Sequence, residues 1–186
     1  MSKRLASAAL LSLLVAVAVA LGAESRPTKS ADEELLALPW KQFDQTLGSG
    51  WRVYACRKDH AGAARLIETY LARRTDLTPT QRAVSNFHAA AELARENRYQ
   101  EALRHLESAE VAPGSRGVPE DWNELVISAR AFLLGDRDAL LASKQRVEAM
   151  RSPAYPHSAE QYLEHLNERY GAWDDPPVPA GCDSMR

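Results

Sequence analysis

The sequence predicts an all-α protein, built as a short solenoid of about three helical hairpins. Residues 87–113 carry apolar side chains at helical spacing on both sides of a turn at residues 96–98, as expected for two antiparallel helices. Similar hairpins precede and follow, with Ala63, Ala102 and Ala139 in comparable places, 39 and 37 residues apart. Three hairpins are about the minimum for a stable stack.

Residues 1–23 form a leader that precedes the predicted fold. Lys3 and Arg4 come before an almost purely apolar run from Leu5 to Ala23, which ends in small residues. This pattern is typical of a cleaved signal peptide and predicts a periplasmic or secreted protein. The run is just long enough to span a bilayer, so an uncleaved N-terminal anchor is the alternative.

The charge of the chain limits the classes of partner that it could bind, and its two cysteines could form a disulfide. Without the leader the chain has 21 basic and 25 acidic side chains. Binding to nucleic acid would need a basic excess, so it is not expected, and membrane contact is expected only if the leader remains uncleaved. An oxidising compartment would allow Cys56 and Cys182 to form a disulfide. The alternative is a buried Cys56 and a free Cys182 in a loose tail.

Residues 24–30 are predicted to be a polar spacer, followed by two short helices. A capping box at Ser30–Glu33 begins a helix that is expected to reach Leu38. Pro39 then interrupts this helix and begins the second one. The turn at Gly48–Gly50 has backbone amides that an anion could bind, but it lacks the spacing of a P-loop, and a plain connector is favoured.

The first hairpin is predicted to consist of helices over Trp51–Lys58 and His60–Arg74, each with an apolar stripe. The second begins at Thr78–Gln81, where a capping box is combined with proline at the first helical position. It ends at Pro113-Gly114, because proline cannot continue a helix.

The third hairpin opens at Pro119–Asp121, turns at Gly135 and returns over Arg137–Met150. Its second helix is less apolar than expected, with Ser143 and Lys144 where bulky residues would pack. A C-terminal capping helix is predicted from Ser158 to a stop at Gly171, to cover the last hairpin. The helical domain would therefore span residues 31–171, and residues 172–186 would form an extended or disordered tail.

The second hairpin resembles a tetratricopeptide repeat (TPR), a two-helix unit that stacks into right-handed solenoids. The matching positions are small residues in the first helix, then a large residue, a turn residue, an aromatic and later small residues: Ala89, Ala90, Leu93, Asn97, Tyr99, Ala102, Ala109 and Pro113. The pattern departs at Asn86, where the repeat usually has an aromatic, and at Ala90, where it usually has glycine.

Residues 40–150 also resemble a group of small secreted bacterial proteins of TPR-like type. The resemblance is carried by Phe43–Thr46, Gly48–Arg52, Gln81-Arg82, Phe87–Ala89 and Trp122-Asn123. It implies a TPR-like fold and export, and it implies no mechanism.

No catalytic or metal-binding pattern stands out in the sequence. No two of the five histidines are three or four residues apart on a helix, and a GxSxG nucleophile motif is absent. Glutamates and aspartates lie among arginines on helical faces, which is typical of solvated faces. We therefore expect a non-enzymatic protein without a cofactor.

In the TPR register, Phe87 and His88 would face the concave groove, with Arg95 two turns further along. Together with Tyr54 these residues are the predicted binding residues. The alternative for His88 is packing against the neighbouring hairpin. The four tryptophans could line a sugar-binding surface, but three of them begin or lie within apolar stripes, which favours core packing. Trp173, in the tail, could instead bind a partner or pack against the last helix.

The expected function is that of an exported scaffold that binds a protein or peptide segment through the groove. The alternative is a periplasmic small-molecule or glycan-binding module, with or without weak hydrolase activity, because aromatic residues lie near the hairpin ends. A third interpretation, a folding or stability accessory for a membrane complex, applies if the leader is uncleaved.

Overall fold

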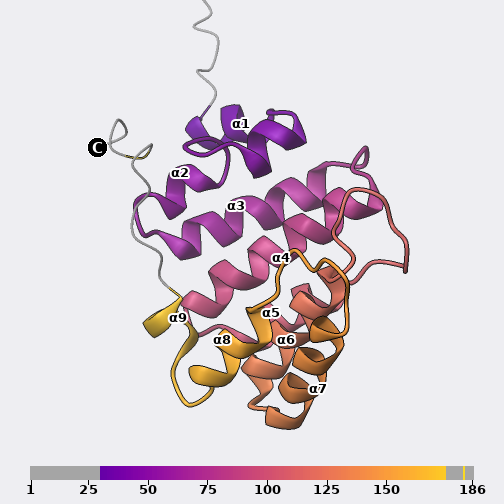
Figure 1. Cartoon of the computed structure of the whole chain (residues 1–186). Helices are drawn as coiled ribbons and strands as arrows, with labels where there is room; N and C mark the ends of the chain where they lie inside the picture. The colour runs from indigo at the N-terminus through magenta and orange to yellow at the C-terminus, as the bar shows by residue number, and fades with distance from the viewer. Residues whose placement is uncertain (1–29, 175–181, 183–186) are drawn as a thin grey trace, which may run out of the picture.

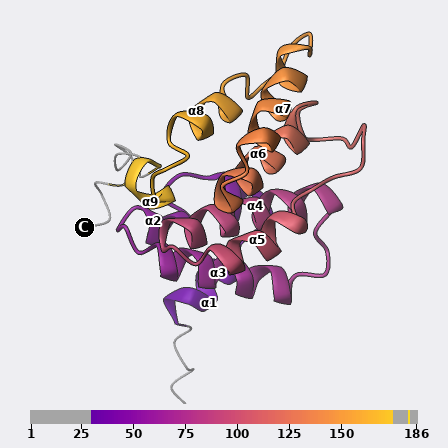
Figure 2. The same cartoon turned by 90° about the horizontal axis from the view of Figure 1, so that it is seen from below.

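The computed structural model describes residues 30–174 and Cys182, and this part of the chain is all-α, without a strand (Figures 1 and 2). The predicted leader, residues 24–29 of the spacer and the remainder of the tail lie outside the described residues. Within the described range no helix combines the length and apolarity that crossing a bilayer requires. The helices are α1 (Ala31–Leu36), the π-helix η1 (Lys41–Gln45), α2 (Arg52–Ala55), α3 (His60–Arg73), α4 (Pro79–Arg95), α5 (Tyr99–Glu107), α6 (Trp122–Leu134), α7 (Arg137–Glu148), α8 (Ser158–Glu164) and α9 (Tyr170–Trp173).

Helix α4 lies at the centre of the molecule. It packs against α3 on one side and α5 on the other, and its C-terminal end contacts α9 (Figure 1). Helices α6, α7 and α8 pack together as a second group beyond α5. Consecutive helices are therefore in contact as α2 with α3, α4 with α5, and α6 with α7.

Small residues allow α4 to serve two apolar cores at once. Ala89 packs with Phe43, Ile67 and Tyr70 in the N-terminal core. Ala90 and Leu93 belong to a larger core that continues through α5 to α9. Alanine side chains let neighbouring helices approach closely, because only a methyl group separates the two backbones.

Local signals set several helix ends as predicted. Thr78 caps α4 with a complete capping box, in which its Oγ1 accepts from the Gln81 amide at 3.2 Å and its own amide donates to Gln81 Oε1 at 3.0 Å. Asn97 makes the turn between α4 and α5 with a φ of 58°, a left-handed conformation that asparagine tolerates. Gly135 ends α6 in the same region of backbone space.

The prediction of a single C-terminal helix is wrong. Helix α8 ends at Glu164, and the separate helix α9 begins at Tyr170. Gly171, the predicted stop, lies inside α9. Glycine suits this position because a Cβ there would lie 2.6 Å from the carbonyl oxygen of Arg95. The break turns α9 onto the end of α4, where the Tyr170 amide donates to the Tyr99 hydroxyl at 3.0 Å. Trp173 is helical as well, so the helical part extends past the predicted boundary.

The two predicted N-terminal helices are present but shorter than expected, as α1 and η1. The glycine turn that follows returns the chain onto η1. A Cβ at Gly50 would lie well inside contact distance of the Phe43 carbonyl, and Gly50 has a φ of 52°. The turn therefore serves as a close-packing connector, and it places Trp51 and Arg52 beside Asp44.

Candidate functional site

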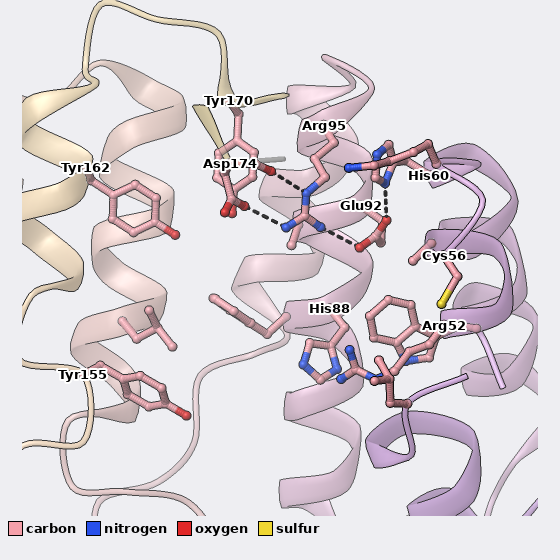
Figure 3. A pocket seen from close by; sticks show the side chains of 17 residues that line it. Arg52, Cys56, His60, His88, Glu92, Arg95, Tyr155, Tyr162, Tyr170 and Asp174 are labelled. Carbon is pink, nitrogen blue, oxygen red and sulfur yellow. Dashed lines mark hydrogen bonds and ion pairs between the residues drawn. The ribbon is translucent and has the colours of Figure 1, made fainter. Parts of the chain in front are cut away.

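A cleft of about 390 Å³ lies between the N-terminal helices and the C-terminal group. One wall comes from α2 and α4, and the other from α6, α8, α9 and the loop that carries Tyr155 (Figure 3). Apolar and aromatic side chains form much of its surface, among them Trp51, Phe87, Leu125, Tyr155, Tyr162 and Tyr170. Size and lining are both typical of a site for a small organic ligand.

Three of the four predicted binding residues, Phe87, His88 and Arg95, line this cleft. Tyr54 does not line it. Its hydroxyl donates to the Asp32 carboxylate, and its ring packs near Gly62 and Arg65, so it faces α1 and α3. The hydrogen bond to Asp32 raises the pKa of the Tyr54 hydroxyl. Tyr54 thus joins α2 to α1.

Asp44 organises the polar end of the cleft. It is fully buried, and its carboxylate accepts hydrogen bonds from Ser85 Oγ at 3.0 Å and from His88 Nδ1 at 3.2 Å. Trp40 Nε1 donates to the same serine oxygen at 3.0 Å. Burial opposes ionisation of Asp44, but the hydrogen bonds and charge of His88, together with Gln45 and Ser85, outweigh it and lower its pKa.

Arg52 is also held by Asp44. Its Nε donates to the backbone carbonyl of Asp44 at 3.0 Å, and its guanidinium lies over the Trp51 indole, 4.2 Å from the ring centre. Burial lowers the pKa of this guanidinium, but arginine stays charged at any physiological pH. We refer to Asp44, Ser85, His88 and Arg52 as the Asp44 cluster.

A second charged group lies at the other end of the cleft. Arg95 Nη1 donates to Glu92 at 2.6 Å, while its Nε and Nη2 donate to the carbonyl and carboxylate of Asp174 at 2.7 and 2.8 Å. His60 Nδ1 lies 2.7 Å from the other oxygen of Glu92. This Arg95 cluster of His60, Glu92, Arg95 and Asp174 joins the start of α3, the end of α4 and the end of α9 (Figure 3).

Cys56 also lines the cleft and forms a disulfide with Cys182, 126 residues later, so the cysteine pairing considered from the sequence is present in the structure. The described part of the C-terminal segment is thus held to the N-terminal wall by a covalent bond and, at Asp174, by Arg95.

The expectation that the carboxylates are solvated is wrong at this site. Asp44 and Glu92 have 0% and 2% of their surface exposed, and Asp121 and Glu124 are also buried. The solvated side of α5 is partly covered as well, since His105 contacts Asn86 at 2.8 Å and Glu68 at 3.2 Å. Helical spacing identifies the apolar face of a helix, but it does not show which polar residues a neighbouring helix will cover.

Sequence reasoning missed Asp44 and Arg52. Asp44 lies 44 residues from His88, and no local motif links the two. Their sequence signals are the glycine turn that lies between them and their place in the segments Phe43–Thr46 and Gly48–Arg52, which carry the resemblance to small secreted proteins but imply no role for either residue. Among residues 30–174 and Cys182, no group of His, Cys, Asp and Glu is arranged to hold a metal ion.

Comparisons with known protein families, curated proteins and solved structures find no match to this chain.

Proposed function

We propose that this chain is an exported, non-enzymatic binding protein that takes a small organic molecule into the cleft between α2–α4 and α6–α9. The observation that supports this most directly is the cleft itself, about 390 Å³, with an aromatic wall and polar side chains that other residues hold in place, among them Arg52, His88 and Arg95. Pockets of this size and character usually bury most of a small ligand.

Binding is favoured over catalysis by a serine, threonine or cysteine nucleophile, given the side chains available. The described residues that line the cleft include no serine or threonine, and Cys56 is in a disulfide. Export is proposed from the basic and apolar pattern of residues 1–23. A TPR-like arrangement of the pairs α2–α3, α4–α5 and α6–α7 is part of the same proposal, motivated by the resemblance of the second hairpin and by the succession of packed pairs.

A second candidate is the binding of a protein or peptide segment. It is favoured by the origin of the lining residues, because α2, α4 and α6 are the first helices of three successive pairs and all contribute to the cleft. In this case the cleft would receive one side chain of an extended partner.

The test compares a blocked cleft with a matched control. Ala91 lines the cleft on α4 and Ala149 is exposed at the end of α7, so Ala91→Phe fills the cleft and Ala149→Phe adds the same ring elsewhere. We expect soluble aromatic and aliphatic metabolites to raise the melting temperature of the parent protein and of Ala149→Phe, but not that of Ala91→Phe.

Stabilisation by peptides, with none by small molecules, would favour the second candidate. Equal responses of the two variants would exclude the cleft as the binding site.

A further inference from the structure

We propose that Arg52 and His88 form an anion-binding subsite in the cleft, and that the ligand is an organic anion whose apolar part lies on the aromatic wall. The inference deepens the proposed function and rests on it. A carboxylate and a phosphate monoester share the required chemistry, a compact anionic group on an apolar body, and the test separates them.

One buried residue orients both donors. Arg52 is held through Nε by the Asp44 carbonyl, and His88 is held through Nδ1 by the Asp44 carboxylate. The two side chains come from α2 and α4, yet both converge on the same end of the cleft (Figure 3). Donors fixed in this way lose little conformational freedom when a ligand arrives, which favours binding.

Among the described residues, none forms a hydrogen bond with the remaining hydrogen-bonding atoms of this pair. Within residues 30–174 and Cys182, Arg52 Nη1 and Nη2 have no hydrogen-bond acceptor, and His88 Nε2 has no partner. The stacking of Arg52 on Trp51 keeps the guanidinium plane in place. A planar guanidinium with two available amino groups matches a carboxylate or phosphate in bidentate geometry.

The other cations of the cleft are engaged already. Arg95 is bound by Glu92 and Asp174, and His60 by Glu92. Lys58 likewise has an interaction within the protein. The positive charge that can meet a ligand therefore lies at Arg52, and at His88 when the imidazole is protonated.

The subsite couples anion binding to proton uptake. With His88 neutral, the charges of Arg52 and Asp44 cancel, and with His88 protonated the cluster has one net positive charge. An incoming anion stabilises the protonated imidazole, so binding should draw a proton from solution. The titratable groups near His88 are Asp44 on η1, which is hydrogen-bonded to it, and those that share its cleft: Arg52 on α2, Lys58 and His60 near the start of α3, Glu92 and Arg95 on α4, Tyr155 in the loop before α8, Tyr162 on α8, Tyr170 on α9 and Asp174 at the end of α9.

The experiment uses the full chain and four probes that share one phenyl group: 3-phenylpropionate, its neutral analogue 3-phenylpropionamide, phenyl phosphate and phenol. Titration calorimetry at pH 6 and pH 8, in buffers with different ionisation enthalpies, measures affinity and proton uptake together. We expect one of the anions to bind at least about tenfold more tightly than its neutral analogue at pH 6, with proton uptake, because a charge-assisted hydrogen bond contributes at least that factor. Whichever anion binds more tightly identifies the anionic group.

Two charge-neutralising variants locate the effect. Arg52→Gln should lose the preference for the anion, while Arg57→Gln, the same change at an exposed position five residues further along, should keep it. His88→Gln should keep part of the preference but lose the proton uptake.

Three results would overturn the subsite. If acid and amide bind the parent protein equally, the cleft binds small molecules but has no anion subsite, and the proposed function survives. If Arg52→Gln and Arg57→Gln behave alike, the anion binds elsewhere. If no probe binds at millimolar concentration, both the subsite and the proposed function are wrong for this class of ligand.

Discussion

The two charged clusters of the cleft contain the same kinds of residue but have different roles. In the Arg95 cluster Nε, Nη1 and Nη2 of the guanidinium each donate to a carboxylate or a carbonyl. Arg95 therefore joins segments that are 79 residues apart. In the Asp44 cluster, within the part of the chain that the structure describes, Arg52 donates a hydrogen bond only through Nε. The comparison teaches that the number of partners, more than exposure or charge, separates a structural arginine from one available to a ligand.

Removing the disulfide, which together with Arg95 holds the C-terminal segment, should have the largest effect on the free energy of unfolding. Replacing both Cys56 and Cys182 with serine should lower the free energy of unfolding by roughly 3–5 kcal/mol, because the bond closes a very long loop in the unfolded chain. Denaturant unfolding with and without reductant measures this. The parent should respond to reductant and the double variant should not. A loss below about 1 kcal/mol would mean that the Arg95 cluster alone holds the segment.

Arg95→Gln is expected to have the next largest effect. It should cost about 3 kcal/mol, because Glu92, only 2% exposed, would lose its strongest partner in a buried site. The same unfolding measurement applies, and amide exchange should show α9 opening first, since Asp174 is released. Protection of α9 equal to that in the parent would contradict the role of Arg95 as a clamp.

Asp44→Asn should cost about 2 kcal/mol near neutral pH, because the amide cannot accept from Ser85 and His88 as a carboxylate does. The folded-state pKa of Asp44 is lowered, so its stabilisation is complete above the unfolded pKa of about 3.9 and is lost as the pH falls through the folded value. The variant should therefore lose stability less steeply than the parent on acidification, measured as the midpoint of urea unfolding against pH. Parallel curves would argue against this coupling.

Gly171→Ala should destabilise the protein by about 1–2 kcal/mol, since the new methyl would overlap the Arg95 carbonyl oxygen unless α9 moves away. Faster amide exchange in α9, with an unchanged rate in α3, would mark this as a local effect. An unchanged melting temperature would show that α9 has room to move.

Arg52→Gln should have the smallest effect on folding and thereby sharpen the comparison. Loss of one hydrogen bond and one cation–π contact predicts a change below about 1 kcal/mol in the free energy of unfolding. Because Arg95→Gln makes the same chemical change, the difference between the two variants measures the structural role directly. Similar losses at both positions would remove the distinction drawn here.

Local patterns predicted most of the fold and part of the site. The caps at Thr78 and Ser30, the turn at Asn97 and the placement of α3 to α7 follow from interactions within one or two helical turns. The grouping of Phe87, His88 and Arg95 on one side of α4 was expected from the resemblance of this hairpin to a tetratricopeptide repeat, and all three line the cleft. Ser143, read as a weak point of α7, is instead buried and donates to Glu124 Oε2 at 2.7 Å, a contact between helices that no local pattern contains.

What the sequence by itself determined is the all-α character of the chain, because helix periodicity, capping and turn chemistry depend on residues a few positions apart. Only the tertiary structure decided which charges are buried and which remain available. Asp44 meets His88, and Arg95 meets Asp174, across 44 and 79 residues. The cost of burying a charge depends on every group packed around it, and that environment exists only after the helices have assembled.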